Sequence, residues 1–355
     1  MTSITNETYT VHFNTNAYDK LNQYLKTNKF SKLFIIVDNN THHHCLPYFM
    51  SQLATELTIE IIEIEAGEVN KNIDTCVGVW NALSELGADR KALIINVGGG
   101  VVTDLGGFIA CTFKRGLKYI NVPTSLLAMV DASVGGKTGV DLGALKNQIG
   151  VISSGDMVLV DTGYLETLPK NHLKSGLAEM LKHGLIYDPS YWNSFLDLDA
   201  LCLTDLDRLI HQSVDIKNTI VTADPFENGL RKTLNFGHTL GHAIESYFLS
   251  QSDKPELLHG EAIAIGMIME SYISSELLGF PKTDLDMIKK TFLDLFDKVA
   301  IDNSDHEAII ELLKYDKKNE HGNINFVLLE QIGQPKIDCL VDNEVILKAF
   351  DYYKL

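Results

Sequence analysis

The sequence predicts an N-terminal α/β domain with a mostly parallel, Rossmann-like sheet, followed by a mostly α-helical domain. Two observations support this prediction. Short apolar runs alternate with amphipathic segments up to about residue 160, which is typical of a parallel sheet covered on both faces. Beyond about residue 170, apolar residues recur at every third or fourth position, as in helices. Since 355 residues exceed one typical domain, we predict two domains, 1–168 and 169–355.

The strands of the first domain are predicted from five β-rich runs, KLFIIVD (32–38), LTIEIIEI (57–64), ALIINV (92–97), LKYINV (117–122) and MVLVD (157–161). Helices are expected between them over 71–86 and 104–113. The second domain is expected to contain helices over 171–187, 204–223, 229–249, 257–278 and 282–297. A strand over 324–330 and a closing helix over 343–353 complete the prediction.

The composition is that of an ordinary globular protein, with 45% hydrophobic and 22% charged residues. No apolar run reaches the length of a membrane span, and the first residues lack a signal-peptide pattern, so we expect a cytoplasmic protein without membrane contact. The net charge of −17 argues against a nucleic-acid partner, which needs a basic face. Five scattered cysteines without a CxxC motif predict free thiols.

A glycine turn follows the third predicted strand, where ALIINV leads into Gly98, Gly99 and Gly100. Strand, glycine turn and helix together suit a phosphate group, because the helix N-terminus offers N–H donors. The spacing is not GxGxxG, and such turns are often merely structural. Asp38, at the end of a strand, could accept ribose hydroxyls, and Glu68 lies in a second polar turn. These additions favour a dinucleotide site.

Residues 122–150 combine small hydroxyls, paired glycines and lysines, which suit binding of phosphate or carboxylate oxygens. Within this block, Gly-Gly-Lys-Thr (135–138) resembles the end of a P-loop. The first glycine of GxxxxGK[ST] would fall at Asp131, however, so the motif fails. A nucleotide-triphosphate hydrolase is therefore not expected.

A metal site is predicted in the second domain, because His238 and His242 lie four residues apart on one helical face. His259 follows in LLHGEA, and Glu179 in SGLAEMLKHGLI could supply a carboxylate. Zinc suits such mixed nitrogen and oxygen ligands, and other divalent metals remain open. The spacing allows His242 to be a fourth ligand or a proton carrier. His183 is interpreted as an ordinary helix histidine, and the histidines at 42–44 as an exposed turn.

Several motifs together resemble the 3-dehydroquinate synthase family over nearly the whole chain. They are GGGVVTD, KRGLKYINVPTSLLAMVDASVGGKTGVD, LKNQIG, SGLAEMLKHG, GLRKTLNFGHTLGHAIE and LHGEAIAIGM. The resemblance implies a dehydroquinate synthase-like fold and conversion of 3-deoxy-D-arabino-heptulosonate 7-phosphate into 3-dehydroquinate and phosphate, in the shikimate pathway. It also implies NAD⁺, zinc or cobalt as the divalent metal, and a homodimer.

Matched position by position, the resemblance implies the metal ligands Glu179, His238 and His259. The residues implied for NAD⁺ are Asp38, Glu68, Lys71, Gly99, Gly100, Val101, Asp104, Thr124, Ser125, Lys137, Lys146, Leu165, Glu166 and Thr167. Those implied for the substrate carboxylate and hydroxyls are Asp131, Lys146, Lys217, Arg231 and His242. Those implied for the phosphate are Lys137, Asn147, Asn235 and one of Lys317 and Lys318, with Lys318 preferred. Lys182 is expected to be catalytic, and Arg115 to reach the substrate of the neighbouring subunit.

The chemistry implied by the resemblance explains this mixture of residues. NAD⁺ takes a hydride from the C5 hydroxyl, which the metal polarises, and the ketone acidifies the proton at C6. Phosphate then leaves by β-elimination, the hydride returns, and the opened ring closes by an intramolecular aldol reaction. In the family, the substrate phosphate itself is thought to help remove the C6 proton, which accounts for the lack of a dedicated carboxylate base.

Three alternatives remain open from the sequence. A sister sugar-phosphate cyclase, such as one that makes 2-deoxy-scyllo-inosose, is disfavoured by Arg231, whose planar fork suits a carboxylate that a hexose phosphate lacks. A metal- and NAD-dependent polyol dehydrogenase would resemble the same overall fold, but the lysine set favours a phosphorylated acid. A catalytically inactive binding protein is disfavoured because all three implied metal ligands are present.

Overall fold

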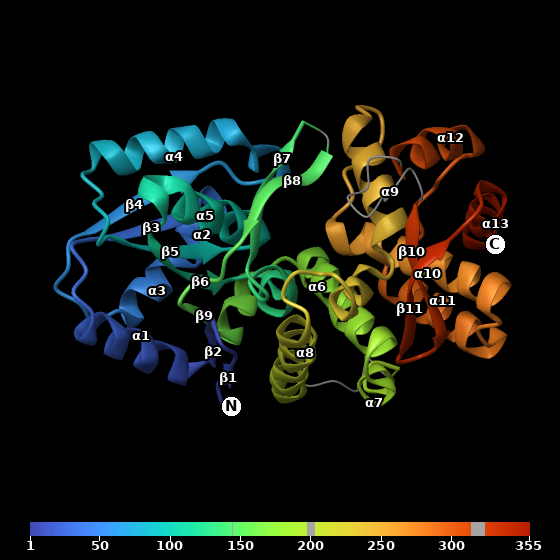
Figure 1. Cartoon of the computed structure of the whole chain (residues 1–355), viewed down its shortest axis with the longest axis horizontal. Helices are drawn as coiled ribbons and strands as arrows, with labels where there is room; N and C mark the ends of the chain where they lie inside the picture. Colours follow the sequence, from blue (N-terminus) through green and yellow to red (C-terminus); the bar gives the residue numbers. More distant parts are fainter. Residues whose placement is uncertain (144, 197–202, 314–323) are drawn as a thin grey trace. The chain divides into compact units, whose positions relative to one another are not determined.

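The computed structural model describes residues 1–143, 145–196, 203–313 and 324–355 (Figure 1). The chain forms two compact units. Unit 1 contains Met1–Leu173 and Lys217–Thr222, and unit 2 contains Lys174–Ile216 and Ala223–Leu355. The domain boundary predicted between residues 168 and 169 stays a prediction. Lys317 and Lys318 lie outside the described residues.

Unit 1 is built on a seven-stranded sheet in the order β1-β2-β9-β6-β5-β3-β4. All neighbouring strands are parallel except β1 and β2, which are antiparallel. The strands are β1 (Ile4–Thr5), β2 (Thr10–Phe13), β3 (Leu33–Asp38), β4 (Ile59–Ile64), β5 (Leu93–Gly98), β6 (Lys118–Pro123) and β9 (Met157–Val160). The five predicted strands are therefore confirmed to within two residues at each end.

The strand order reverses between β3 and β5, because β3 pairs with β4 on one side and β5 on the other. In open parallel sheets, ligands bind at the carboxyl ends of the strands that flank such a reversal. Asp38 ends β3 and Gly98 ends β5, so both belong to this edge of the sheet. The topology thus places the predicted dinucleotide residues where the fold favours a ligand.

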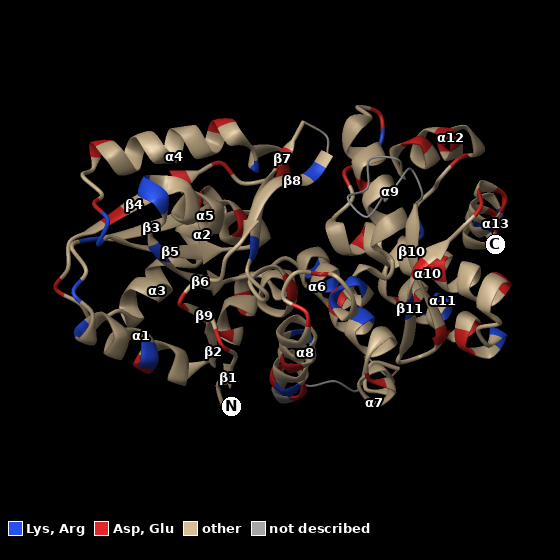
Figure 2. Ribbon diagram, viewed as in Figure 1, with Lys and Arg blue, Asp and Glu red and all other residues tan. Residues whose placement is uncertain are grey.

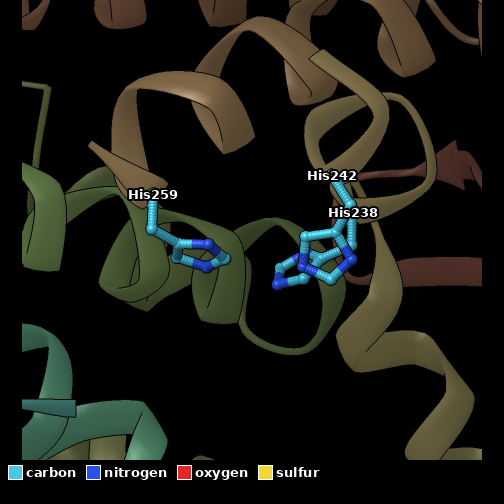
Figure 3. A group of neighbouring side chains, drawn as sticks. All are labelled: His238, His242 and His259. Atoms are coloured by element: carbon cyan, nitrogen blue, oxygen red, sulfur yellow. The ribbon is translucent and has the colours of Figure 1, made fainter. Parts of the chain in front are cut away.

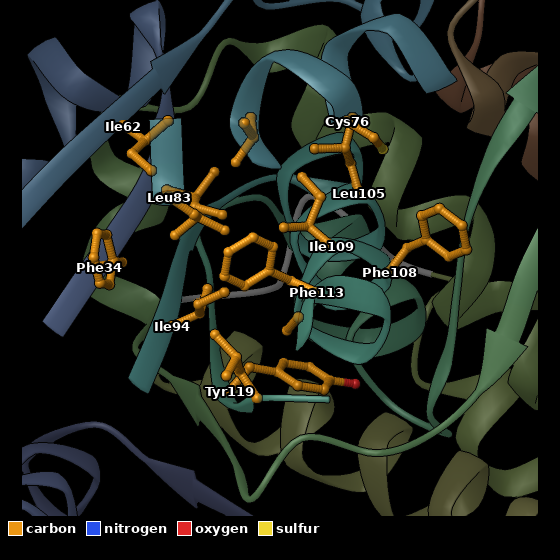
Figure 4. Packing of buried hydrophobic residues seen from close by; sticks show 14 of the residues in the cluster. Phe34, Ile62, Cys76, Leu83, Ile94, Leu105, Phe108, Ile109, Phe113 and Tyr119 are labelled. Atoms are coloured by element: carbon orange, nitrogen blue, oxygen red, sulfur yellow. The ribbon is translucent and has the colours of Figure 1, made fainter. Parts of the chain in front are cut away.

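The helices of unit 1 lie on both sides of the sheet (Figure 1). They are α1 (Thr15–Thr27), α2 (Asn39–His44), α3 (Leu46–Gln52), α4 (Ile73–Glu85) and α5 (Gly100–Thr112). Figure 4 shows the core between the sheet and α5, where Phe34, Ile94, Leu105 and Ile109 are fully buried. An antiparallel hairpin, β7 (Lys137–Leu142) with β8 (Leu145–Ile152), forms a separate two-stranded sheet.

Unit 2 is organised around α10 (His259–Leu278), which contacts α9 (His238–Ser250), α11 (Lys282–Leu295), α13 (Asn343–Lys354) and strand β10 (Asn325–Gln331). Strand β10 pairs antiparallel with β11 (Gln334–Leu340). The other helices with residues in this unit are α6 (Lys170–Ile186), α7 (Pro189–Asn193), α8 (Leu203–Ala223) and α12 (Asn303–Leu312). Residues 259–274 of α10 are almost all buried, which makes it the central helix of this unit.

One predicted helix is wrong in a way that matters for function. The segment 229–249 is not continuous: a 3-10 helix over Leu230–Asn235 ends before Gly237, and α9 begins at His238. Gly237 has φ +79°, a left-handed conformation that favours glycine and interrupts the helix. Arg231 and Asn235 are therefore not on the helix that carries the two histidines.

Smaller differences concern elements that the sequence pattern did not predict. Strand β11, the hairpin β7–β8, helix α12 and the N-terminal elements β1 to α1 were missed. The histidines at 42–44 belong to α2, so the predicted turn is wrong, although their side chains are exposed as expected. Helix α5 begins at Gly100, four residues before its predicted start at Asp104.

Two surface properties bear on partners. Among the described residues, no helix combines the length and apolar character needed to span a membrane. Figure 2 shows acidic residues distributed over the helices of both units, for example on α4 and α12. This distribution agrees with the net charge of −17.

Candidate active site

In unit 2, two histidines from two helices converge on a carboxylate oxygen of a third helix. Glu179 of α6 is fully buried, and its Oε1 lies 3.4 Å from His238 Nε2 and 3.4 Å from His259 Nε2. His238 is the first residue of α9, and His259 is the first residue of α10. The predicted Glu-His-His set is thus assembled in space from separate helices.

The spacing of these atoms fits a divalent metal. Ligand atoms around a tetrahedral zinc ion with bonds of about 2.1 Å lie about 3.4 Å from one another. Both distances from Glu179 Oε1 to histidine nitrogens match that separation. One carboxylate oxygen and two imidazole nitrogens also form the donor set that such an ion prefers. The residues present therefore fit the metal that the sequence predicts.

His242 lies beside the same cluster. Its ring centroid is 5.1 Å from that of His238 and 5.7 Å from that of His259. Figure 3 shows the three imidazoles facing one region from α9 and from the start of α10, and their candidate ligand atoms lie within 4.8 Å of one another. A fourth ligand and a proton carrier both remain compatible with this position.

The electrostatics of the cluster favour a cation. Burial lowers the pKa of His259, but the nearby carboxylates of Glu245 and Glu179 outweigh burial and raise the pKa to about 10. A site that attracts a proton so strongly presents negative charge to whatever cation occupies it. The same negative charge would stabilise a divalent ion.

Two residues of α6 lie next to Glu179. Lys182 forms a buried ion pair with Glu179 Oε2, one helical turn along α6. His183 is also buried, and its Nδ1 lies 2.7 Å from Ser213 Oγ. Lys182 therefore lies beside the cluster, and its catalytic role stays a prediction. His183 has a hydrogen-bonding partner, and its interpretation as an ordinary helix histidine stays a prediction.

Arg231 and Asn235 are held by a tight loop before α9. The carboxylate of Asp224 accepts the backbone N–H of Arg231 at 3.0 Å, and Pro225 O accepts a guanidinium N–H at 2.7 Å. Asn235 Nδ2 donates to Glu227 Oε1 at 2.8 Å. Arg231 is 2% exposed, so its position is set by packing and hydrogen bonds.

Unit 1 brings five predicted residues into one ionic network. Lys71 Nζ lies 2.6 Å from both Asp104 Oδ2 and Asn147 Oδ1, and Lys146 forms a close ion pair with Glu68. Burial lowers the pKa of Lys71, but Asp104 and Glu68 outweigh it and raise the pKa. The carboxylates that pair with Lys71 thus hold its ammonium group in the charged form.

The glycine turn next to this network has the predicted form. β5 ends at Gly98, Gly99 is the N-cap of α5, and the first helical residue is Gly100. Asp38 also caps a helix, since its Oδ1 accepts the N–H of Thr41 at 2.7 Å. The remaining nucleotide candidates occupy the start of α5, the segment after β6 and the 3-10 turn Thr162–Thr167: Val101, Thr124, Ser125, Leu165, Glu166 and Thr167.

The other substrate candidates of unit 1 fall into two groups. Lys217 Nζ lies 2.6 Å from both the backbone oxygen and Oδ1 of Asp131. Lys137 is exposed at the start of β7, directly after the turn that contains Gly135 and Gly136. Arg115 is exposed as well, with φ +71°.

Three residues next to the candidates were not singled out from the sequence. Glu245 Oε2 lies 3.3 Å from His259 Nδ1. Glu270 accepts the backbone N–H of Gly237 at 2.6 Å, and Asp141 Oδ1 accepts that of Asn147 at 2.5 Å. Only Glu245 had a usable signal, because it lies three residues after His242 and on the same helical face.

Two family models match consecutive parts of the chain. The model of the 3-dehydroquinate synthase N-terminal part matches residues 61–175, and that of the 3-dehydroquinate synthase C-terminal part matches 176–319. The chain belongs to the 3-dehydroquinate synthase family. The 3-dehydroquinate synthase of Parabacteroides distasonis is 42% identical over 94% of this chain and 95% of its own. That of Streptococcus pyogenes serotype M5 is 37% identical over 97% and 99%, respectively.

Solved structures confirm the fold class. A 2-epi-5-epi-valiolone synthase from Streptomyces hygroscopicus, with NAD⁺ and Zn²⁺ bound, has a TM-score of 0.84 at 25% identity, covering 100% of this chain and 99% of its own. A 2-deoxy-scyllo-inosose synthase, in complex with carbaglucose-6-phosphate, NAD⁺ and Co²⁺, has a TM-score of 0.81 at 25% identity, covering 96% and 95%. Glycerol dehydrogenase from Schizosaccharomyces pombe, at 14% identity and a TM-score of 0.67, covering 97% and 88%, shares the fold alone.

Proposed function

We propose that the chain converts 3-deoxy-D-arabino-heptulosonate 7-phosphate into 3-dehydroquinate and phosphate. One observation carries the proposal: a chain 42% identical to a 3-dehydroquinate synthase over nearly its full length has Glu179, His238 and His259 converging at metal-ligand spacing. Relatives with that name are more similar in sequence than the sister cyclases at 25% identity. The reaction is a carbon–oxygen lyase reaction with no net oxidation.

The proposed cofactors are NAD⁺ and a divalent metal, zinc or cobalt. When bound, the metal would polarise a substrate hydroxyl and NAD⁺ would accept a hydride and return it. We assign the metal to Glu179, His238 and His259. Lys182 offsets part of the negative charge of Glu179, because its ammonium group pairs with the Oε2 that does not face the histidines.

We assign NAD⁺ to the carboxyl end of the sheet in unit 1. The N–H groups at the start of α5 suit the pyrophosphate, and the Asp38 carboxylate suits the ribose hydroxyls. We also assign Lys71 and Lys146 to NAD⁺; their ammonium groups pair with Asp104 and Glu68, respectively. Thr124, Ser125 and the turn Leu165–Thr167 complete the proposed set.

The substrate is a phosphorylated sugar acid, which requires several cationic and amide donors. We assign the carboxylate and hydroxyls to Asp131, Lys146, Lys217, Arg231 and His242, and the phosphate to Lys137, Asn147 and Asn235. Arg231 is the residue that distinguishes this substrate from a hexose phosphate, because a fixed guanidinium matches a carboxylate with two parallel hydrogen bonds. His242 is proposed to transfer protons at its ring nitrogens.

Two further proposals concern assembly and location. We propose a homodimer in which Arg115 contributes to the site of the neighbouring subunit. Arg115 is exposed and has a left-handed backbone conformation. This conformation is rare for residues other than glycine, so the local turn must enforce it. We infer a reducing, cytoplasmic setting from the cysteines, since Cys45, Cys76, Cys111 and Cys339 are all free.

The proposal is tested by supplying the purified chain with zinc, NAD⁺ and either the heptulosonate phosphate or glucose 6-phosphate. We expect phosphate release from the heptulosonate phosphate alone, with 3-dehydroquinate identified by NMR. A carbocycle made from glucose 6-phosphate would overturn the substrate assignment in favour of a sister cyclase.

Two variants test the assigned residues. His238→Ala should abolish turnover and metal binding while NAD⁺ binding persists, and unchanged turnover would refute the metal assignment. Arg231→Lys should raise the KM for substrate, because a point charge replaces a planar fork. An unchanged KM would refute its role toward the carboxylate.

A further inference from the structure

A second carboxylate contacts the metal cluster from outside the proposed ligand set. Glu245 of α9 is 7% exposed, and its Oε2 lies 3.3 Å from His259 Nδ1. His238, His242 and Glu245 follow one another at spacings of four and three residues, so they share one face of α9. His259 belongs to α10, so this contact joins the two helices that carry the histidines.

The two proposed histidine ligands have the same arrangement of hydrogen bonds. In each, Nε2 lies 3.4 Å from Glu179 Oε1, and Nδ1 faces an acceptor on the opposite side of the ring. For His238 the acceptor is the backbone oxygen of Phe236 at 3.1 Å. For His259 it is Glu245. An imidazole that donates from Nδ1 has its lone pair on Nε2, which is the form that binds a metal.

The backbone around His259 is held without Glu245. The N–H of Leu258 donates to Glu261 Oε2 at 2.7 Å, and the N–H of Gly260 donates to Ser175 Oγ at 2.8 Å. These hydrogen bonds fix the backbone on both sides of His259, at the start of α10. What remains to be set is the rotation and tautomer of the imidazole, and Glu245 is the side chain that contacts its Nδ1.

We propose that Glu245 is a positioning residue for the metal: it orients the His259 ring and keeps the Nδ1 proton, so that Nε2 is presented to the cation. This inference rests on the metal assignment of the proposed function. Acceptors of this kind typically change metal affinity by 10–100-fold when removed, because the ligand must then be oriented at the moment of binding. The carboxylate also adds negative charge beside the ion.

The test measures zinc affinity of the full-length chain by competition with a chromophoric chelator, in the absence of NAD⁺ and substrate. Glu245→Ala should weaken zinc binding about 10–100-fold. Glu245→Gln, which keeps an acceptor but loses the charge, should weaken it less. Glu276→Gln is the matched control, because Glu276 is exposed near the far end of α10 and should leave zinc affinity unchanged.

Two comparisons separate the possible failures. If both Glu245 variants bind zinc as the unmodified chain does, while His238→Ala does not bind it, the metal assignment stands and the positioning role of Glu245 is refuted. If His238→Ala also binds zinc normally, the metal assignment itself fails. Should Glu245→Ala not fold, Glu245→Gln decides the question, and an affinity equal to that of Glu276→Gln overturns the proposal.

Discussion

Helices α9 and α10, which carry the three histidines, pack closely against each other at glycine residues. A Cβ atom added at Gly266 of α10 would lie 2.0 Å from the backbone oxygen of Gly237 and 2.8 Å from the backbone nitrogen of Gly241. Both neighbours are backbone atoms at the start of α9, where His238 is located. The separation of the histidine-bearing helices therefore depends on the absence of a side chain at Gly266.

Gly266→Ala should push the two helices apart by about 1.4 Å, the shift that would bring the new Cβ from 2.0 Å to about 3.4 Å from Gly237 O. Such overpacking costs about 1–3 kcal/mol of stability. The distance from a metal ion to its ligand atom varies by only about 0.2 Å. A shift of the helices by more than that therefore separates His238 from His259 beyond what one ion can bridge. We expect zinc affinity to fall at least about tenfold, the lower end of the effect of disturbing ligand orientation.

The assay combines zinc affinity with the midpoint of thermal unfolding of the metal-free chain. Gly78→Ala is the matched control, because Gly78 lies within α4 and an added Cβ would meet nothing within 4 Å. That variant should gain about 0.4–1 kcal/mol of stability and keep its zinc affinity. If Gly266→Ala bound zinc as tightly as Gly78→Ala, the contact between α9 and α10 would not set the ligand spacing.

Three further predictions concern other parts of the chain. Glu270→Ala removes the carboxylate that accepts two N–H groups at the start of α9, so urea unfolding should show a loss of about 1–3 kcal/mol, with a smaller loss for Glu270→Gln. Burial and the charge of Lys354 lower the pKa of His306 in the folded chain. Its contribution to stability is therefore fully present above the ordinary pKa of about 6.5 and is lost as the pH falls from there through the lowered folded pKa; His306→Asn should flatten the pH dependence of the unfolding midpoint over that range. Tyr9 Oη accepts the N–H of Gly135 at 3.1 Å, so Tyr9→Phe should speed hydrogen exchange of that amide, and an unchanged rate would contradict this contact.

Strands and long helices were predictable because burial imposes a period on apolar residues. The five predicted strands are short apolar runs, and all were confirmed. The hairpin β7–β8 was missed because every residue of β8 is exposed or only half-buried, so no alternation marks it. The break before α9 was missed because the pattern continues through Gly237, and only its φ of +79° reveals the turn.

The candidate site was predictable as a set of residue types but not as a set of contacts. The spacing of the two histidines on α9 could be predicted from the helical repeat. The approach of Glu179 and His259 could not, because it depends on how three helices pack. The spacing from His242 indicated that Glu245 lies on the same face of α9, but its proposed role could not be predicted, because Glu245 contacts a histidine of a different helix. The single helix predicted over 229–249 is wrong, since Arg231 precedes the break at Gly237 and so lies on a different element from the two histidines.

The proposed reaction consumes and regenerates NAD⁺ within each turnover. The most direct test follows phosphate release and absorbance of NADH together, with zinc and excess heptulosonate phosphate and with NAD⁺ at a small fraction of the substrate concentration. We expect released phosphate to exceed the supplied NAD⁺ by far while no NADH accumulates. Accumulation of NADH in proportion to product, or phosphate release that stops once NAD⁺ is exhausted, would contradict it.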